Sequence, residues 1–290
     1  MTSPRIAIAS CDEWKSRAHD DGLLASALKE RGAEVSIESW SDGSIDWLAF
    51  ERVVIRSTWD YHHRVDEFRA WLRLFDAGPR RLLNPAAAVL GNLDKRYLLD
   101  LAAQGVAVVP TVRLEPGATE GLAEVAGAQG WEAVVVKPSV SASADGTWRC
   151  DATRFADEEE RFVTQLREQA LLVQPYLKEI EAAGEWSLVF LGGELSHALV
   201  KTPASGDFRV QEEHGGDQHV VEPPAGLVGD ARELLTATEG KVGDRLTYAR
   251  VDGVERDGRL LLMELEINEP GLFLELVPEA AGRFADVILS

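Results

Sequence analysis

The sequence predicts an α/β protein, with a parallel sheet near its N-terminus and antiparallel strands further along the chain. Short apolar segments alternate with helical patterns from residue 5 to residue 75, and this alternation is typical of parallel strands joined by crossover helices. Asp257-Gly258 and Gly192-Gly193 each separate two strand-like segments, which indicates β-hairpins. A chain of 290 residues is long enough for about two domains.

The first elements follow from the spacing of their apolar residues. Asp20–Arg31 has apolar residues at the helical period and stops at Gly32, a residue type that commonly ends helices. No Gly-x-Gly-x-x-Gly is present, so a dinucleotide-binding fold is not expected. We expect strands at Arg5–Ser10, Ala33–Trp40 and Arg52–Ser57, and helices at Asp20–Arg31 and Val65–Phe75.

The residues after the third expected strand are candidates for contact with a substrate. Ligands of parallel sheets bind beyond the carboxyl ends of the strands, and the sequence R-S-T-W-D-Y begins at such an end. The alternative is a loop that is anchored by an aromatic side chain. The candidate substrate-binding residues are Arg56, Ser57, Trp59, Asp60 and Tyr61.

A second region begins after Leu82-Leu83-Asn84-Pro85, which is expected to close the first domain. Pro85–Asn92 is expected to be a connection, Leu93–Gln104 a helix and Val106–Thr111 a strand. Lys95 would lie in the first turn of that helix. A lysine there is usually a solvated surface residue, but cations are not favoured at a helix N-terminus, so its position favours a function.

Lys137 ends a fully apolar strand, Glu132–Pro138, and a buried ammonium group needs a partner. The segment that follows, residues 139–147, consists mostly of small residues and is expected to be flexible. Such a loop can close over phosphate groups with backbone N–H groups and hydroxyls. The loop residues of interest are Ser141, Ser143, Gly146 and Thr147.

The second half of the chain predicts antiparallel strands with helices between them. Pro175 lies near the end of a strand and cannot donate an N–H, so the edge there is open to a ligand. We expect strands at Leu171–Leu177, Trp186–Leu191 and Glu194–Lys201, and helices at Asp157–Gln169, Val228–Thr238 and Ala280–Ile288.

The hairpin from Tyr248 to Ile267 carries the clearest site signal. Glu264 and Glu266 are two residues apart on its second strand, so their carboxylates point to the same face. In apolar surroundings these carboxylates raise each other's pKa, and a cation would relieve their repulsion. Asp252 on the first strand supplies a third oxygen ligand, and an all-oxygen set suits Mg²⁺. The alternative is a solvated acidic strand edge.

Composition excludes some classes of partner. The formal net charge is -19 and the pI is near 4.7, which argues against binding to nucleic acid or to an anionic membrane surface. A nucleotide pocket needs only a few local cations. Cys11 and Cys150 show neither metal-binding spacing nor a disulfide framework, and we see no signal peptide or membrane span, so a cytoplasmic location is expected.

Several of these motifs resemble the ATP-grasp ligases. A-R-V-D at residues 249–252 is similar to D-alanine–D-alanine ligases, and the interval from Asp252 to Glu264 (264 − 252 = 12) resembles ribosomal-protein glutamate ligases. Gln174-Pro175-Tyr176-Leu177 resembles bacterial glutathione synthetases. The resemblance implies an ATP-grasp fold, with an N-terminal α/β domain (1–88), a lid subdomain (89–172) and a C-terminal subdomain (173–290).

The resemblance also implies roles for individual residues, with ATP and two Mg²⁺ ions as cofactors. The metal pair is either Glu264 with Glu266, in which Glu266 replaces the usual Asn, or Glu266 with Asn268 one register later, and Asp252 is the third ligand. The loop is poorer in glycine than is usual, and Ser187 stands where the family has Arg. The implied nucleotide ligands are Lys95, Lys137, Ser141, Ser143, Gly146, Gln174, Pro175, Tyr176, Leu177 and Glu185; the implied catalytic cations are Lys201, Arg209 and Arg250.

The implied reaction joins a carboxylate to an amine through an acyl phosphate, with release of ADP and phosphate. R-S-T-W-D-Y and G-E-W-S-L-V-F resemble an ATP-grasp group that includes the O-ureidoserine cyclo-ligase of antibiotic (D-cycloserine) synthesis. The expected substrate is therefore a small amino-acid-like molecule. The alternatives are an intermolecular amino-acid or peptide ligase and a non-catalytic ATP-binding regulator. A homo-oligomer is compatible with the sequence.

Overall fold

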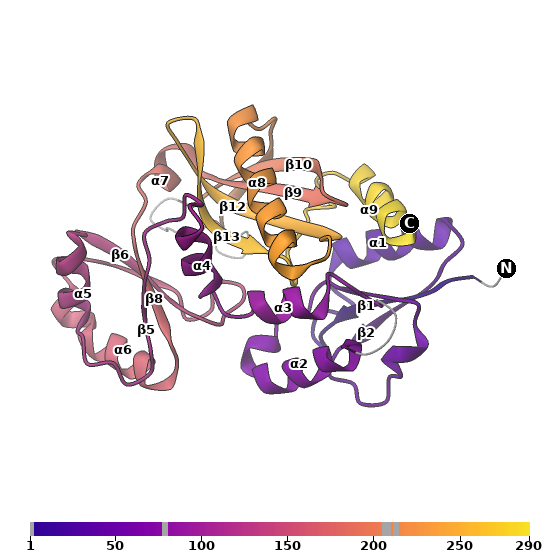
Figure 1. Cartoon of the computed structure of the whole chain (residues 1–290), viewed down its shortest axis with the longest axis horizontal. Coiled ribbons are helices and arrows are strands. Elements are labelled where there is room, and N and C mark those ends of the chain that lie inside the picture. Colours follow the sequence, from indigo (N-terminus) through magenta and orange to yellow (C-terminus); the bar gives the residue numbers. More distant parts are fainter. Residues whose placement is uncertain (1–2, 77–80, 205–209, 211–214) are drawn as a thin grey trace.

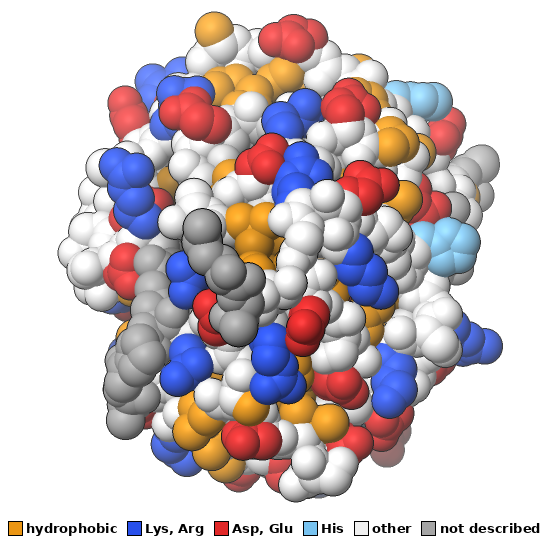
Figure 2. Space-filling model, turned by 90° about the vertical axis from the view of Figure 1, so that its right-hand side faces the viewer, with side chains coloured by type: hydrophobic (Ala, Val, Ile, Leu, Met, Phe, Trp, Pro, Cys, Tyr) orange, Lys and Arg blue, Asp and Glu red, His pale blue; other side chains and the backbone are white. Residues whose placement is uncertain are grey.

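The computed structural model describes residues 3–76, 81–204, 210 and 215–290, which form three sheets with helices packed against them (Figure 1). The observed class is the predicted mixture of a parallel sheet and antiparallel sheets. Among the described residues, no helix has the length and apolar character that crossing a bilayer requires. On the face drawn in Figure 2, the described acidic and basic side chains are interspersed rather than gathered by sign.

The N-terminal sheet is parallel, in the order β2-β1-β3-β4. Its central strand β1 is buried along almost its whole length, as expected for a strand covered on both faces. The elements are β1 (Arg5–Ser10), α1 (His19–Glu30), β2 (Glu34–Ser39), η1 (Trp47–Ala49), β3 (Arg52–Ile55), η2 (Tyr61–His63), α2 (Val65–Leu72), η3 (Arg73–Phe75) and β4 (Leu82–Leu83). The predicted alternation of strands and helices is confirmed here.

A second, antiparallel sheet has the order β5-β8-β6-β7 and carries α5 and α6 over an apolar core. Strand β6 ends on Lys137 and Pro138, so the loop of residues 139–147 leaves the sheet beside the centre of the molecule. We refer to this sheet and its helices as the lid. The elements are β5 (Val112–Leu114), α5 (Leu122–Gln129), β6 (Ala133–Pro138), β7 (Trp148–Asp151), α6 (Phe155–Glu168) and β8 (Leu171–Pro175).

The third sheet is antiparallel, in the order β11-β10-β9-β12-β13. Helix α8 packs against it, and α9 packs against α1 of the N-terminal sheet (Figure 1). The last helix therefore joins the two ends of the chain in one core. The elements are α7 (Glu179–Ala183), β9 (Glu185–Leu191), β10 (Glu194–Thr202), β11 (Asp217–Val220), α8 (Ala225–Val242), β12 (Tyr248–Arg256), β13 (Arg259–Glu266) and α9 (Glu279–Leu289).

The connecting region differs from the sequence prediction. The segment expected to be a connection contains helix α3 (Ala86–Asn92), because Pro85 fixes a suitable backbone angle ahead of three alanines. Helix α4 (Tyr97–Ala103) begins after Lys95, so this lysine lies before the helix and not in its first turn. The prediction of a strand at Val106–Thr111 is wrong, since this part of the chain makes only the single bridge Val108↔Leu262.

Other short elements escaped prediction. They are short, between two and eight residues, so their apolar patterns alone do not separate them from loops. They are β4, β5, α5, β7, α7 and β11. The domain boundaries stay a prediction; in the structure α4 packs with Leu98 and Leu101 into the core of the third sheet.

One buried asparagine links the N-terminal sheet to the third sheet. Asn84 is fully buried and has a positive φ of 38°, a conformation that Asn tolerates better than most residues. Its amide nitrogen donates to the carbonyls of Tyr248 (2.9 Å) and Ile267 (2.6 Å). Its side-chain oxygen accepts from the backbone N–H of Thr247 at 2.7 Å. These bonds satisfy backbone groups that no water can reach.

We predict that Asn84→Ala lowers the free energy of unfolding by about 3–5 kcal/mol, because several buried backbone groups lose their partners at once. Asn92→Ala is the matched control, since Asn92 makes one half-buried bond, to the carbonyl of Leu265 at 2.9 Å, and should cost about 1 kcal/mol. Urea unfolding of the three proteins measures the difference. Equal losses in the two variants would contradict the proposed role of Asn84.

Candidate active site

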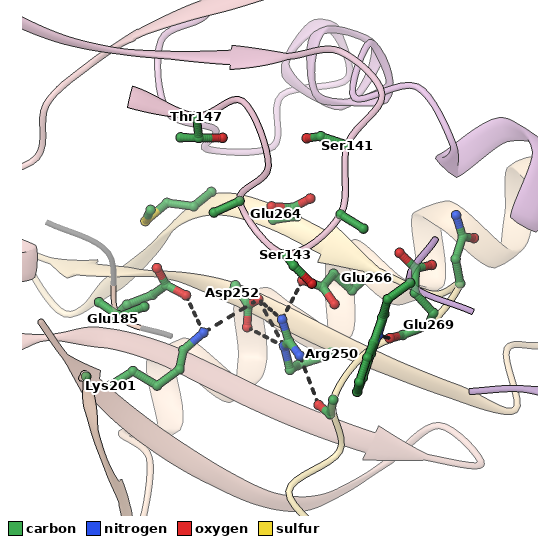
Figure 3. A pocket seen from close by; sticks show the side chains of 18 of the residues that line it. Ser141, Ser143, Thr147, Glu185, Lys201, Arg250, Asp252, Glu264, Glu266 and Glu269 are labelled. Atoms are coloured by element: carbon green, nitrogen blue, oxygen red, sulfur yellow. Dashed lines mark hydrogen bonds and ion pairs between the residues drawn. The ribbon is translucent and has the colours of Figure 1, made fainter. Parts of the chain in front are cut away.

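A cavity of about 1180 Å³ lies where the three sheets meet. Ligand pockets commonly measure about 300–1,000 Å³, so this volume suits a nucleotide together with a second molecule. Figure 3 shows its floor, formed by the strands of the third sheet, and the loop of the lid that lies across it. The predicted residues that line the cavity are Arg56, Trp59, Tyr61, Lys95, Lys137, Ser141, Ser143, Gln174, Pro175, Tyr176, Leu177, Glu185, Lys201, Arg250, Asp252, Glu264, Glu266 and Asn268.

The floor is positioned by the hairpin of β12 and β13. Its turn is Asp257-Gly258, and both residues have a positive φ, as the turn prediction requires. Asp252 lies directly opposite Glu264 in the pairing of the strands. The register then shifts at Gly253, where a Cβ would come within 2.4 Å of the Leu261 carbonyl oxygen. A glycine there permits the bulge that follows the acidic pair.

Arg250 holds two of the predicted metal ligands. Its Nε and Nη2 donate to the carboxylate of Asp252 at 2.8–3.0 Å, and Nη2 also donates to Glu266. Its Nη1 donates to the Gly271 carbonyl at 2.9 Å. Burial opposes ionisation of Asp252, but Arg250 and Lys201 outweigh it and hold the pKa of this carboxyl below its usual range. Burial raises the pKa of Glu266 to about 8.

Lys201 lies on the same side of the cavity as Arg250 (Figure 3). Its ammonium group is 2.5 Å from a carboxylate oxygen of Glu185 and 3.9 Å from one of Asp252. Burial disfavours the charged lysine, but these two carboxylates prevail and raise the pKa of Lys201. Lys201 therefore stays charged inside the protein.

Two further lysines approach Glu264 from outside the third sheet. The ammonium of Lys95 is 3.3 Å from Glu264 Oε1 and donates to the Ser141 carbonyl at 2.8 Å. Burial lowers the pKa of Lys137, and Glu264 opposes this shift in part. Burial also disfavours the charged form of Glu264, yet Lys95 and Lys137 lower its pKa. The described contacts give Lys137 no direct hydrogen bond or ion pair, so its charge is available to an anion.

The lid loop turns above the acidic side chains of the third sheet and carries Ser141 and Ser143 (Figure 3). Ser141, Ser143 and Thr147 line the cavity, as the sequence predicted for this loop. Gly146 does not line it; a Cβ there would lie 2.8 Å from the Pro138 ring, and its φ is 69°. The structure therefore gives Gly146 a part in the turn and no contact with the cavity.

The hinge after β8 forms one wall of the cavity. Gln174 is fixed by a hydrogen bond from its amide nitrogen to Thr111 Oγ1 at 2.8 Å. The Tyr176 hydroxyl donates to Glu181 at 2.6 Å, and the guanidinium of Arg149 lies 3.6 Å from the centre of its ring. The hydroxyl of Tyr176 and its contact with Arg149 thus fix the position of its ring in this wall.

Two oxygen atoms of the cavity wall are buried and have no hydrogen-bond partner among the described residues: Asn268 Oδ1 and Glu269 Oε2. Such atoms carry a free-energy cost unless a ligand satisfies them. Asn268 follows the acidic pair on the same chain segment, and its amide oxygen is a type of ligand that Mg²⁺ accepts. The donor set of Asp252, Glu264, Glu266 and Asn268 thus fits a hard cation.

The substrate candidates of the first domain divide into two groups. Arg56, Trp59 and Tyr61 line the cavity. Ser57 does not, since it is buried and donates to Asp21. Asp60 does not either; it accepts from Trp40 Nε1 at 2.7 Å and from Arg64, and so belongs to the packing of its own domain.

Arg56 is only 2% exposed, yet its guanidinium is not saturated. Nη2 donates to the Pro270 carbonyl at 2.7 Å, while Nε and Nη1 have no hydrogen-bond partner among the described residues. Its nearest carboxylate, Asp21, is 3.8 Å from Nε. The free N–H groups make Arg56 a candidate anchor for an anionic group.

The acidic residues at the end of the cavity near Arg56 were not predicted from the sequence. Glu269 follows Asn268 and contacts the Tyr61 hydroxyl; burial raises its pKa to about 7. Asp20, Asp21 and Glu275 also line the cavity. Sequence spacing could not show that these residues lie together, because they come from helix α1 and from the connection between β13 and α9. Arg209, which the sequence singled out, lies outside the described residues.

Comparison with known proteins finds relatives that span the chain. The family model described as the N-terminal domain of D-cycloserine synthetase DcsG matches residues 6–84. The chain is 33% identical over 294 residues to the cycloserine biosynthesis protein DcsG of Streptomyces lavendulae, with 93% of each protein covered. A crystal structure of D-cycloserine synthetase DcsG matches with a TM-score of 0.87 and 30% identity, covering 98% of each chain.

More distant structures share the fold. An ATP-grasp RimK domain protein of Sphaerobacter thermophilus has a TM-score of 0.72 at 18% identity, covering 99% of this chain and 100% of its own. D-alanine–D-alanine ligase of Bacillus anthracis, in its complex with ATP, has a TM-score of 0.70 at 16% identity, with 99% and 96% covered. The predicted ATP-grasp fold is confirmed.

The raised pKa of Asp21 predicts how the free energy of unfolding depends on pH. Burial raises its pKa from 3.8 to about 6, so the folded state binds this proton more tightly than the unfolded state. The stability that the proton confers is complete below about pH 4 and is lost as the pH rises through about 6, a change of about 3 kcal/mol. We therefore expect the unfolding free energy of wild type minus that of Asp21→Asn to fall by most of that amount, about 2 kcal/mol, between pH 4 and pH 7.

Chemical denaturation at a series of pH values measures this difference. Loss of the Asp21 charge also leaves Arg56 without its nearest carboxylate, but a guanidinium stays charged throughout this range, so that effect is a constant offset. Parallel curves for the two proteins would contradict the raised pKa.

Proposed function

This chain belongs to the D-cycloserine synthetase (DcsG) family and is an ATP-dependent ligase; from that premise we propose that it closes a small amino-acid-like substrate on itself. The proposed substrate is O-ureidoserine, whose carboxylate and nucleophilic nitrogen belong to one molecule. The observation that carries this proposal is the 33% identity to the Streptomyces lavendulae protein along 93% of both chains. Membership of a ligase family favours an enzyme over a nucleotide-binding regulator.

In this proposal the nucleotide lies between the lid and the third sheet. Lys95 and Lys137 contact the phosphates, and the hydroxyls of Ser141 and Ser143 close over them. The support is physical: Lys137 is 9% exposed, lines the cavity and has no direct anionic partner within the described part of the chain. The hinge residues Gln174, Pro175, Tyr176 and Leu177 form the adenine wall, and Glu185 is placed for the ribose hydroxyls.

Mg²⁺ would be held by Asp252, Glu264 and the oxygen atoms that follow them, and when bound it would neutralise charge on the phosphates. We propose two ions, as the family resemblance implies. Glu264 faces Lys95 and Lys137, the proposed phosphate ligands. Glu266 accepts from Arg250, whereas Asn268 Oδ1 has no hydrogen-bond partner in the described structure, so we favour Asn268 over Glu266 as the second member of the pair.

The proposed reaction has two steps. A substrate carboxylate oxygen attacks the γ-phosphorus of ATP; the bond to the β,γ-bridging oxygen breaks and ADP leaves. The substrate nitrogen then attacks the acyl carbon, loses its proton, and displaces phosphate. Lys201, Arg250 and Arg209 would stabilise the developing negative charge. Of these, Arg250 also positions Asp252 and Glu266, so its removal would disturb several groups together.

The substrate would occupy the end of the cavity lined by Arg56, Trp59 and Tyr61. Two N–H groups of Arg56, which have no hydrogen-bond partner among the described residues, are available to an anionic group. One carboxylate oxygen of Glu269 likewise has no partner in that part of the chain, which suits an ammonium or N–H group of the same molecule. A cation and carboxylates at one end match a zwitterionic substrate.

We predict that Glu264→Gln lowers ADP release at saturating Mg²⁺-ATP by at least about 100-fold, because it removes a carboxylate that the phosphoryl-transfer centre requires. Glu255→Gln is the matched control, since it makes the same change on the same hairpin away from the cavity. A coupled assay for ADP measures both variants. Comparable turnover in Glu264→Gln and wild type would remove Glu264 from the site.

A second measurement tests the substrate. With O-ureidoserine as the sole organic substrate, wild type should release one ADP per molecule of cyclic product, and added hydroxylamine should trap an acyl hydroxamate. Turnover that needs two different compounds would indicate an intermolecular ligase instead. Each enantiomer is assayed separately, because the sequence does not fix stereochemistry.

A further inference from the structure

Two histidines and an aspartate come together outside the cavity floor. His62 and His63 belong to η2, at the carboxyl end of β3, and Asp145 belongs to the lid loop. One ligand atom from each residue lies within 4.8 Å of the others. The closest pair is His62 Nε2 and Asp145 Oδ2, at 3.2 Å. Residues 83 positions apart in the sequence are thus joined by groups that commonly bind metals.

An ordinary hydrogen bond between histidine and aspartate does not explain the whole arrangement. That bond needs one imidazole, yet the rings of His62 and His63 lie with centroids 3.8 Å apart. Burial and the neighbouring His63 both lower the pKa of His62, which favours the neutral imidazole that binds metals. The side chain of His62 is 8% exposed, and its Nδ1 is buried without a hydrogen-bond partner among the described residues.

The spacing of the ligand atoms suits a small tetrahedral ion. With metal–ligand bonds of about 2.0–2.1 Å, neighbouring ligand atoms of such an ion are about 3.4 Å apart. The separation of 3.2 Å between His62 and Asp145 is already close to this value. His63 and Asp145 are exposed, so rotation of their side chains can close the wider gaps, and the solvent side leaves a fourth position for water.

We propose that His62, His63 and Asp145 bind a borderline divalent cation, Zn²⁺ or Co²⁺, and that this ion fastens the lid loop to the N-terminal domain. Two imidazoles and one carboxylate suit Zn²⁺ or Co²⁺ better than Mg²⁺, which prefers oxygen ligands. The site is therefore chemically distinct from the acidic floor of the cavity.

Because Asp145 belongs to the lid loop, an ion bound to it would restrain this loop. Its loop carries Ser141 and Ser143 over the cavity, and Ala142 of the same loop packs into the core of the N-terminal domain. Among the described residues, the contact of His62 with Asp145 is the polar side-chain link between the N-terminal sheet domain and this loop. A bound ion would strengthen that link and hold the loop in the position seen here.

The test is metal binding to the full chain without an affinity tag, in excess Mg²⁺ so that the acidic floor is saturated. Zn²⁺ is titrated against a chromophoric chelator, and Co²⁺ is followed by its visible absorption bands. Wild type should bind one ion per chain with the absorption of a four-coordinate Co²⁺ site. His63→Ala and Asp145→Asn change exposed residues, so both should fold, and each should weaken binding at least tenfold.

Two further variants separate this site from other sources of affinity. His19→Ala removes an exposed imidazole that faces a single carboxylate, Glu275, at 3.5 Å, and should leave binding unchanged. Glu264→Gln alters the acidic floor and should also leave it unchanged. Absence of a bound ion in wild type, equal affinity in His63→Ala, or loss of the ion in Glu264→Gln would each overturn the proposal.

Discussion

The burial of carboxylates at the meeting point of three sheets is the constraint on which the rest of the site depends. Charges taken out of water are costly unless they are paired and hydrogen-bonded. Here Arg250 lies between Asp252 and Glu266, and Lys201 lies between Glu185 and Asp252. A guanidinium suits this place because its fork of N–H donors serves two carboxylates and a carbonyl together. Without it the floor would hold adjacent negative charges with nothing between them.

The compensating cations come from separate parts of the chain, so the site exists only in the assembled fold. Lys95 precedes α4, Lys137 ends β6 of the lid, and Lys201 belongs to β10. The lid therefore delivers positive charge as well as a cover for the cavity. On the opposite side, Asn84 and the Tyr248 hydroxyl fix the substrate end of the cavity against the floor. The hydroxyl is 2.9 Å from the carbonyl oxygens of Ile55 and Asn268. Precise placement of this kind is what positioning catalysis requires.

Sequence analysis could find the groups whose spacing is local. Asp252 and Glu264 are recognisable because a hairpin turn fixes their register. Lys137 is recognisable because a buried ammonium group at the end of an apolar strand needs an anionic or polar partner. It could not find Asn84 or Glu269, since their partners are distant in the sequence. It also placed Ser57 and Asp60 in the substrate group, although both are used to pack their own domain. A position at a strand end shows where a side chain begins and not which way it points.

The glutamate in place of the usual asparagine can be understood from the charges around it. Glu266 accepts a hydrogen bond from Arg250, and burial raises the pKa of this carboxyl to about 8 although the guanidinium opposes the shift. Two residues later, the buried amide oxygen of Asn268 has no hydrogen-bond partner among the described residues. The segment from Glu264 to Asn268 thus divides two tasks between neighbouring positions: Glu266 accepts a hydrogen bond from the arginine, and Asn268 offers the oxygen that a hard cation can take.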